Sequence, residues 1–151
     1  MRTFTSAQDW LDAQGETLGT SDWVEITQDM VNKFADSTGD HQWIHVDVER
    51  AKKESPFGGP IAHGFLTLSL LPSLGWQVFT SEGAKMGVNY GCNKVRFPAP
   101  VPVGAKVRST LVLSEASMVG DAVQTVVTHT LEVEGGSKPV CIAETVSRIY
   151  Y

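Results

Sequence analysis

Two residues near the middle of the chain could carry out acid–base chemistry together. Asp40 and His45 lie five positions apart in the segment GDHQWIHVD, directly after Gly39, where a predicted helix ends. In a loop or an irregular turn, this spacing lets a carboxylate and an imidazole converge on one small ligand such as a water molecule. Because imidazole titrates close to neutrality, such a pair can polarise and deprotonate that water. The spacing alone is a weak signal, and it favours the ordinary alternative of a turn aspartate followed by a partly buried histidine.

A glycine stands where a buried helix is predicted to begin. The turn residues Gly58–Gly59–Pro60 precede His63 and Gly64. The first N–H groups of a helix have no intrahelical acceptor, and a glycine lets a ligand approach them closely. These donors could hold the oxygen of a thioester carbonyl as it gains enolate character. A glycine that only permits close packing of helix on sheet explains Gly64 equally well.

The histidines do not predict a metal site. His41 and His45 are four positions apart, but the sequence offers no third clear ligand, so we expect no metal. We expect His41 to face solvent or a partner and His63 to have a structural role. His129 alternates with apolar neighbours, which predicts a residue on the surface of a sheet.

Hydrophobic residues follow a helical period in the N-terminal half of the chain. Ser6, Thr27 and Asp47 are predicted to cap three helices, of which the second ends at Gly39. The segment 21–25 (SDWVE) predicts a short strand between the first two helices.

A long apolar segment and a change of period define the fold class. Residues 61–79 are apolar nearly all round, which predicts a helix surrounded by protein, kinked or divided by Pro72 near Leu71. From Met86 onward the period is two, which predicts four long strands: 86–97, 105–119, 121–134 and 138–151. We therefore expect an α+β fold in which a curved antiparallel sheet of about five strands wraps one central helix.

Composition limits the classes of function. The length of 151 residues fits one domain (1–151), and the 42% hydrophobic and 19% charged residues are typical of a soluble globular protein. A net charge of −5 argues against non-specific nucleic-acid binding and against a polybasic membrane patch. Cys92 and Cys141 belong to no metal or redox motif, which favours two reduced thiols. The N-terminal segment does not resemble a signal peptide, and we expect a cytoplasmic protein.

The segments around the Asp–His pair resemble a known family. The run GDHQWIHVD, followed by PFGGPIAHGFLTLSLLPSL, is similar to the hydratase signature of the MaoC-like dehydratase family, which includes (R)-specific enoyl-CoA hydratases and NodN-like proteins. The later YGCNKVRFPAPVPVGAKVR is also similar to the family's strand and connection after the central helix, and the resemblance runs from about residue 20 to the end. It implies a hot-dog fold. One departure is Gln42–Trp43 in place of the usual Asn-Pro, which bears on pocket shape and acyl-chain preference.

The resemblance implies roles for four residues. Asp40 and His45 match the family's two catalytic residues, Gly64 matches the residue whose amide contacts the oxyanion, and Ile44 matches the apolar residue before the histidine. The implied reaction is hydration of a trans-2-enoyl-CoA to an (R)-3-hydroxyacyl-CoA, without a metal or an organic cofactor. The implied assembly is a homodimer whose sheets join edge to edge, with the acyl-CoA near the interface.

Further side chains are candidates for binding the substrate. Large aromatic residues could line an acyl pocket, although such residues are more often plain core; these are Trp43, Phe65 and Trp76. Cations could hold CoA phosphates, although a solvated strand face explains them equally well; these are Lys94, Arg96 and Arg108, with Asn93 beside them.

Two other functions fit the same residues. An acyl-CoA thioesterase would use Asp40 to activate water towards the thioester carbonyl, but the paired His45 favours hydration. A non-catalytic thioester-binding subunit is a different class, and the presence of both Asp40 and His45 counts against it. A hydratase could also run as a dehydratase on an acyl carrier protein, and the sequence does not decide between these carriers.

Overall fold

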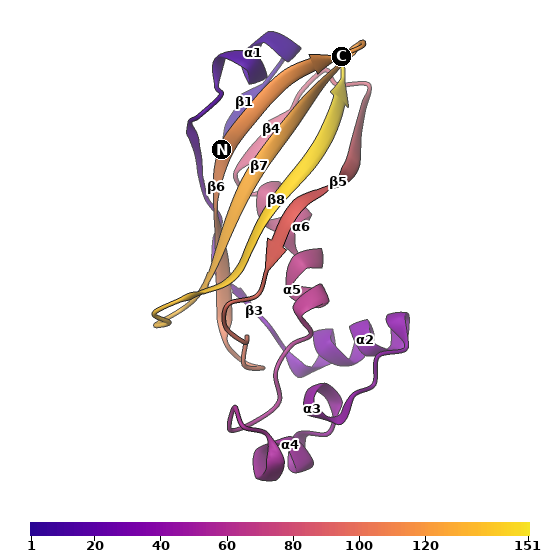
Figure 1. Cartoon of the computed structure of the whole chain (residues 1–151), viewed down its shortest axis with the longest axis vertical. Helices are drawn as coiled ribbons and strands as arrows, with labels where there is room; N and C mark the ends of the chain where they lie inside the picture. The colour runs from indigo at the N-terminus through magenta and orange to yellow at the C-terminus, as the bar shows by residue number, and fades with distance from the viewer.

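A curved antiparallel sheet makes up most of the protein (Figure 1). The computed structural model describes residues 1–151, and its main sheet has six strands. In spatial order these are β2 (Thr17–Thr20), β6 (Lys106–Val119), β7 (Ala122–Val133), β8 (Pro139–Tyr150) and β5 (Met86–Arg96), with β3 (Val24–Glu25) also paired to β6. A separate parallel pair consists of β1 (Arg2–Phe4) and β4 (Phe79–Ser81). The α+β class and the four long strands are confirmed, whereas the predicted strand over 21–25 is confined to β3, and β1, β2 and β4 were missed.

Helices lie at both ends and along one face of this sheet (Figure 1). They are α1 (Ala7–Asp12), α2 (Gln28–Thr38), α3 (Trp43–Val46), α4 (Val48–Glu54), α5 (Gly64–Ser69) and α6 (Leu71–Gly75). In Figure 1, α2, α3 and α4 lie together beyond the lower end of the strands, and α5 and α6 run from there along β8 and β5. None of these helices has the length and apolar character needed to cross a membrane.

Short polar side chains begin three of the helices where the sequence predicts. The side chains of Ser6, Thr27 and Asp47 accept hydrogen bonds from backbone N–H groups in the first turns of α1, α2 and α4. α2 ends at Gly39, whose φ of 80° lies in the left-handed region that favours glycine. These local signals fix the position at which the chain leaves α2 and enters the segment with Asp40.

The central helix is divided, and it is not surrounded by protein. The break between α5 and α6 falls at Leu70, and Pro72 stands in the first turn of α6, as predicted. The inner sides of both helices pack on the sheet through Leu66, Leu71 and Leu74. On the other side, the side chains of Phe65 and Trp76 are 69% and 70% exposed, which corrects the expectation of a helix buried all round.

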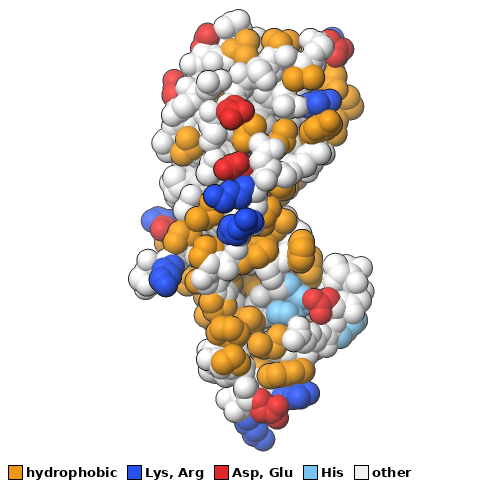
Figure 2. Space-filling model, in the orientation of Figure 1, with side chains coloured by type: hydrophobic (Ala, Val, Ile, Leu, Met, Phe, Trp, Pro, Cys, Tyr) orange, Lys and Arg blue, Asp and Glu red, His pale blue; other side chains and the backbone are white.

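The exposed side of the central helix lies beside a free sheet edge. β5 pairs only with β8, and most of its residues are exposed along the whole strand. Figure 2 shows hydrophobic side chains gathered down this side of the molecule. The strand therefore has unpaired backbone groups and uncovered apolar side chains at the same place.

His129 was predicted on the sheet surface, but it belongs to the core. Its side chain on β7 is 5% exposed, and Nδ1 lies 3.3 Å from Oγ of Ser109 on β6. The inner face of β7 faces α6 and not solvent, so the alternation with apolar neighbours placed the ring inside. Burial lowers the pKa of His129 to about 4, which keeps the imidazole neutral at neutral pH.

Acid should destabilise the fold through His129. The folded-state pKa of about 4 lies below the ordinary value of 6.5, so the unfolded chain binds more protons between these values and stability rises with pH there. We expect this residue to remove about 2 kcal/mol from the free energy of unfolding between pH 7 and pH 5. Urea unfolding of the wild type and of His129→Gln at both pH values measures this change in the free energy of unfolding. An equal pH dependence in the two proteins would contradict the assignment.

Candidate active site

Asp40 lies in the short loop that joins α2 to α3. Its backbone N–H donates to Oγ1 of Thr38 over 3.4 Å, and its Oδ1 accepts from the backbone N–H of Gln42 over 3.3 Å. These contacts form a turn directly after Gly39, and the side chain of Asp40 remains more than half exposed. The carboxylate is therefore held by its own loop and still accessible to a ligand.

His45 is carried by α3, a single helical turn that the sequence did not predict. Its Nδ1 lies 2.6 Å from the carbonyl oxygen of Ile61, and since a carbonyl only accepts, Nδ1 carries the proton. The other ring nitrogen, Nε2, then has a free lone pair and can accept a proton. The side-chain amide of Gln28 donates to the carbonyl oxygen of His45 over 2.8 Å, which ties α3 to the start of α2.

The electrostatic surroundings shift the pKa values of His45 and His41 in opposite directions. Desolvation by burial lowers the pKa of His45 more than the hydrogen bond to the Ile61 carbonyl raises it, and smaller effects of His63, which lowers it, and Asp40, which raises it, follow. The hydrogen bond to Asp36 raises the pKa of His41, which is exposed as expected and whose Nε2 lies 2.9 Å from Oδ1 of Asp36. At neutral pH, His45 is therefore available as a base.

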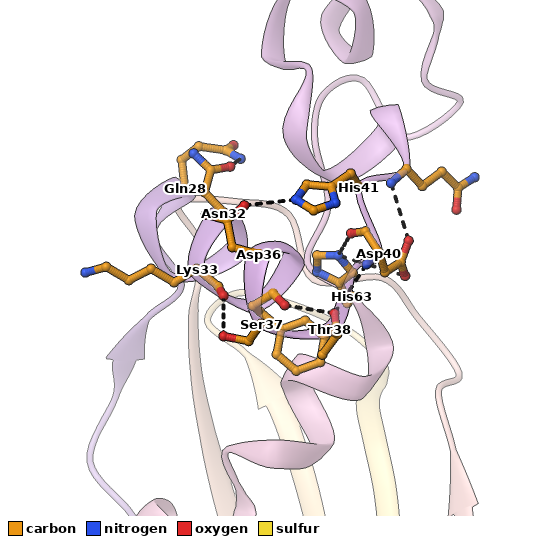
Figure 3. A network of polar contacts seen from close by, with 11 residues as sticks. Gln28, Asn32, Lys33, Asp36, Ser37, Thr38, Asp40, His41 and His63 are labelled. Atoms are coloured by element: carbon orange, nitrogen blue, oxygen red, sulfur yellow. Dashed lines mark hydrogen bonds and ion pairs between the residues drawn. The ribbon is translucent and has the colours of Figure 1, made fainter.

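A third residue, His63, joins Asp40 and His45. Its Nε2 lies 2.9 Å from the backbone oxygen of Asp40, and its ring stacks on that of His45 with centroids 3.9 Å apart. Figure 3 shows the ring of His63 pointing at Asp40 from the start of α5. Ligand-type atoms of all three residues lie within 4.8 Å of one another. From the sequence we expected only a structural role for His63, although its place next to Gly64 in the IAHG segment was the available signal.

A cavity of about 460 Å³ opens beside these residues. Its lining includes His45 and Gly64 together with Ile61, Thr67 and Phe97. Gly64 is the first residue of α5, and the side chain of His63 does not cap that helix, so the amides of its first turn are left for another acceptor. A Cβ on Gly64 would lie 3.2 Å from the ring of Phe97, so a larger residue would require this ring to shift by a few tenths of an ångström.

The other residues expected to bind substrate lie outside the cavity lining. Trp43 is covered by the guanidinium of Arg50, 4.4 Å from its ring centroid. Phe65 is exposed and meets Phe97 edge-on with ring centroids 6.3 Å apart. Ile44 contributes its carbonyl oxygen to the N–H of Ile61 over 3.2 Å. These residues surround the site without entering the cavity.

The polar candidates on the strands differ in whether their side chains already have a hydrogen-bond partner within the chain. Asn93 and Lys94 are exposed on β5, and the guanidinium of Arg96 donates to the carbonyl oxygen of its neighbour Val95 over 2.7 Å. Arg108 is bound to Glu132 over 2.6 Å and is a poor candidate for a phosphate contact.

Trp76 lies at a second cavity. That cavity has a volume of about 600 Å³, and His129 and Thr125 also line it. None of the residues that line it belongs to the group formed by Asp40, His45 and His63.

Asp40, His45 and His63 together offer three possible metal ligands, of which the sequence did not reveal His63. Their geometry fits a hydrogen-bond network better than a metal site. The rings of His45 and His63 are nearly parallel, at 26°, so their in-plane lone pairs do not converge on one point. Nε2 of His63 is also occupied by the carbonyl of Asp40. The arrangement can hold and deprotonate a water molecule through Asp40 and His45.

A central helix packed on a curved antiparallel sheet is the hot-dog arrangement, and Asp40 and His45 lie beside His63 at the start of this helix. The model of the MaoC like domain matches residues 9–136, and the chain belongs to this family of MaoC-like dehydratases. The resemblance of the sequence segments is thereby confirmed, and the protein is an enzyme of the hydro-lyase class.

Two relatives and one solved structure give the family more detail. The chain is 58% identical over 149 residues to 3-hydroxyacyl-thioester dehydratase Z of Mycobacterium tuberculosis, covering 98% of each chain. It is 45% identical over 140 residues to nodulation protein N of Rhizobium leguminosarum bv. viciae, covering 91% of this chain and 86% of the relative. The unliganded R-hydratase PhaJ1 from Pseudomonas aeruginosa has the same fold, with a TM-score of 0.71 at 23% identity over 91% of this chain and 81% of the other.

The histidines should titrate in a fixed order. Because burial lowers the pKa of His45 and Asp36 raises that of His41, His45 should titrate below 6.5 and His41 above it. NMR titration of the Cε1–H signals, assigned with His41→Gln and His45→Gln, measures both values. A His45 signal that titrates above that of His41 would contradict the proposed neutral base.

Proposed function

We propose that this enzyme adds water reversibly to trans-2-enoyl-CoA and forms (R)-3-hydroxyacyl-CoA. The observation that carries the proposal is the unprotonated Nε2 of His45 beside the carboxylate of Asp40, at the mouth of a cavity that Gly64 also lines. The 58% identity to a 3-hydroxyacyl-thioester dehydratase supports the same chemistry. Acyl-CoA is the thioester that we propose for this chain.

In the proposed reaction, Asp40 and His45 both hydrogen-bond one water molecule. Nε2 of His45 takes a proton from it as its oxygen forms a bond to the β-carbon of the enoyl group. Asp40 orients the water and takes part in the proton transfer, and the α-carbon receives a proton on the same face of the former double bond. The overall change is the addition of one water molecule, so the residues need no metal or organic cofactor.

Gly64 would stabilise the charge that develops on the thioester. As the β-carbon is attacked, electron density moves to the carbonyl oxygen, and the backbone N–H of Gly64 donates to that oxygen. The position of Gly64 in the cavity lining, next to His63 and across from Phe97, supports this role.

The residues around the cavity would bind the rest of the substrate. Phe65 extends the apolar wall begun by Phe97, and Trp43 and Ile44 flank His45 on α3. Arg96 ends β5 next to Phe97, and Asn93 lies on the same strand; we propose that they contact the phosphates of CoA, because cationic side chains suit phosphate oxygens. We place the enzyme in the cytoplasm, where both free thiols, Cys92 and Cys141, stay reduced.

A second copy of the chain would cover the free edge of β5. The strand offers eleven residues of backbone for antiparallel pairing, and exposed apolar side chains surround it. These are Phe65, Trp76, Met86, Val88, Tyr90 and Phe97. We propose a homodimer whose sheets join edge to edge through β5, which would bring the partner close to Phe97 and the cavity.

Hydration should depend on Asp40 and His45. With crotonyl-CoA or a longer trans-2-enoyl-CoA, we expect loss of the enoyl thioester absorbance without release of thiol. Asp40→Asn or His45→Gln should lower turnover by about 10²–10⁴-fold, since each variant removes a proton-transfer group and keeps the size of its side chain. Asp36→Asn and His41→Gln are matched controls from the same region and should remain active.

Each other outcome of this assay points to a different function. Release of free CoA thiol would assign a thioesterase. No loss of enoyl absorbance and no release of thiol with the CoA substrates, followed by turnover of an acyl carrier protein thioester, would identify the carrier-protein thioester as the substrate. Near-normal turnover in both Asp40→Asn and His45→Gln would overturn the catalytic assignment.

The homodimer should be visible as a mass of twice 16.4 kDa in light scattering after size exclusion. Trp76→Glu places a charge in the exposed apolar strip beside β5 and should shift the protein towards the monomer. Met118→Glu, at an exposed position on β6 that β7 and β8 separate from β5, should leave the mass unchanged. A wild-type mass of one chain would contradict the proposal.

A further inference from the structure

His63 is more deeply buried than either residue of the pair that it joins. Its side chain is 3% exposed, compared with 9% for His45 and an exposed Asp40. One face of the ring stacks on His45, and the ring of Phe34 lies 4.9 Å away between centroids. The residue therefore connects the loop after α2, the helical turn α3 and the start of α5.

The hydrogen bonds of His63 define its tautomer. The backbone oxygen of Asp40 can only accept, so Nε2 of His63 carries the proton and donates to it over 2.9 Å. Nδ1 is buried without a hydrogen-bond partner, so it holds the lone pair. The ring of His63 therefore acts as a hydrogen-bond donor to the backbone of Asp40.

We infer that His63 is a positioning residue that holds the carboxylate and the imidazole of the active site in register: its N–H fixes the backbone of Asp40, and its ring supports the ring of His45. The inference rests on the proposed hydration by Asp40 and His45. It gives the buried histidine a role in catalysis although it reaches neither water nor substrate.

The two contacts act on different properties of the site. The hydrogen bond restrains an otherwise exposed loop, and the position of the Asp40 carboxylate depends on that loop. The stacked ring excludes water from one face of His45, where Asp40 and His63 are the titratable groups that face it. Loss of the first contact should misplace the carboxylate, and loss of the second should hydrate the imidazole.

Two substitutions separate the contacts. His63→Phe keeps an aromatic ring against His45 and loses the N–H donor. His63→Gln keeps a donor for the Asp40 carbonyl and loses the stacked ring. We expect His63→Phe to lower kcat by about 10- to 100-fold, because a misplacement near 1 Å has such an effect, with KM changed less than about threefold. His63→Gln should recover most of kcat. The exposed neighbour provides the matched control, and His41→Phe should keep kcat near that of the wild type.

The pH dependence of kcat/KM gives the complementary result. His63→Gln opens His45 to water, which relieves the desolvation that lowers its pKa, so the acidic limb should move to higher pH. His63→Phe keeps the ring that covers His45 and loses only the smaller lowering effect of the His63 imidazole, so its limb should move less than that of His63→Gln. A general loss of stability would lower activity in both variants. It would not produce a loss of kcat mainly in His63→Phe together with a shift of the acidic limb mainly in His63→Gln. Wild-type kcat and an unmoved limb in both variants would overturn the inference.

NMR separates a failure of this inference from a failure of the proposed function. The absence of hydration by the wild type would contradict the proposed function, and the spectra would still test His63. The carbonyl carbon signal of Asp40 should move in His63→Phe and stay in place in His63→Gln, and the pKa of His45 should rise more in His63→Gln than in His63→Phe. Signals that are unchanged in both variants would show that His63 holds neither group.

Discussion

The hydrogen bond between Nδ1 of His45 and the carbonyl of Ile61 is the interaction on which the rest of the site depends. It decides which ring nitrogen is free, and it ties α3 to an extended segment just before α5. That segment is itself fixed, because the N–H of Ala62 donates to Val101 and the N–H of Ile61 donates to Ile44. Three parts of the chain thus meet at one peptide unit, and the free Nε2 of His45 is a consequence of that backbone geometry.

Local chemistry made much of the fold predictable. Capping by Ser6, Thr27 and Asp47, the left-handed Gly39 and the interruption at Pro72 depend on neighbouring residues, and each is found as expected. The alternation that begins at Met86 predicted the long strands for the same reason. The short strands β1, β2 and β4 were missed, since each is formed by pairing with a distant segment and has too few residues for a period.

The candidate site was predictable in its members and not in their connections. The motif around Asp40 and His45 placed both residues close together, but it did not reveal that His63, eighteen positions after His45, stacks on its ring. His129 was assigned to the wrong face of the sheet, because alternation shows that two faces differ and does not show which one the helix covers. The exposure of Phe65 and Trp76 was missed for a similar reason. Apolar residues on all sides of a helix predict that protein covers the helix, and they do not show whether this chain or a partner covers it.

Phe97 links the edge of the sheet to the cavity. It directly follows the last residue of β5, and its ring lies against Gly64 at the start of α5. The wall of the cavity is therefore carried by the strand that has a free edge, and any strand that pairs with β5 will restrict the motion of that wall. In an enzyme assembled through this edge, activity per subunit would fall on dilution. The concentration of the enzyme in a cell would then determine the activity of each subunit as well as the total activity.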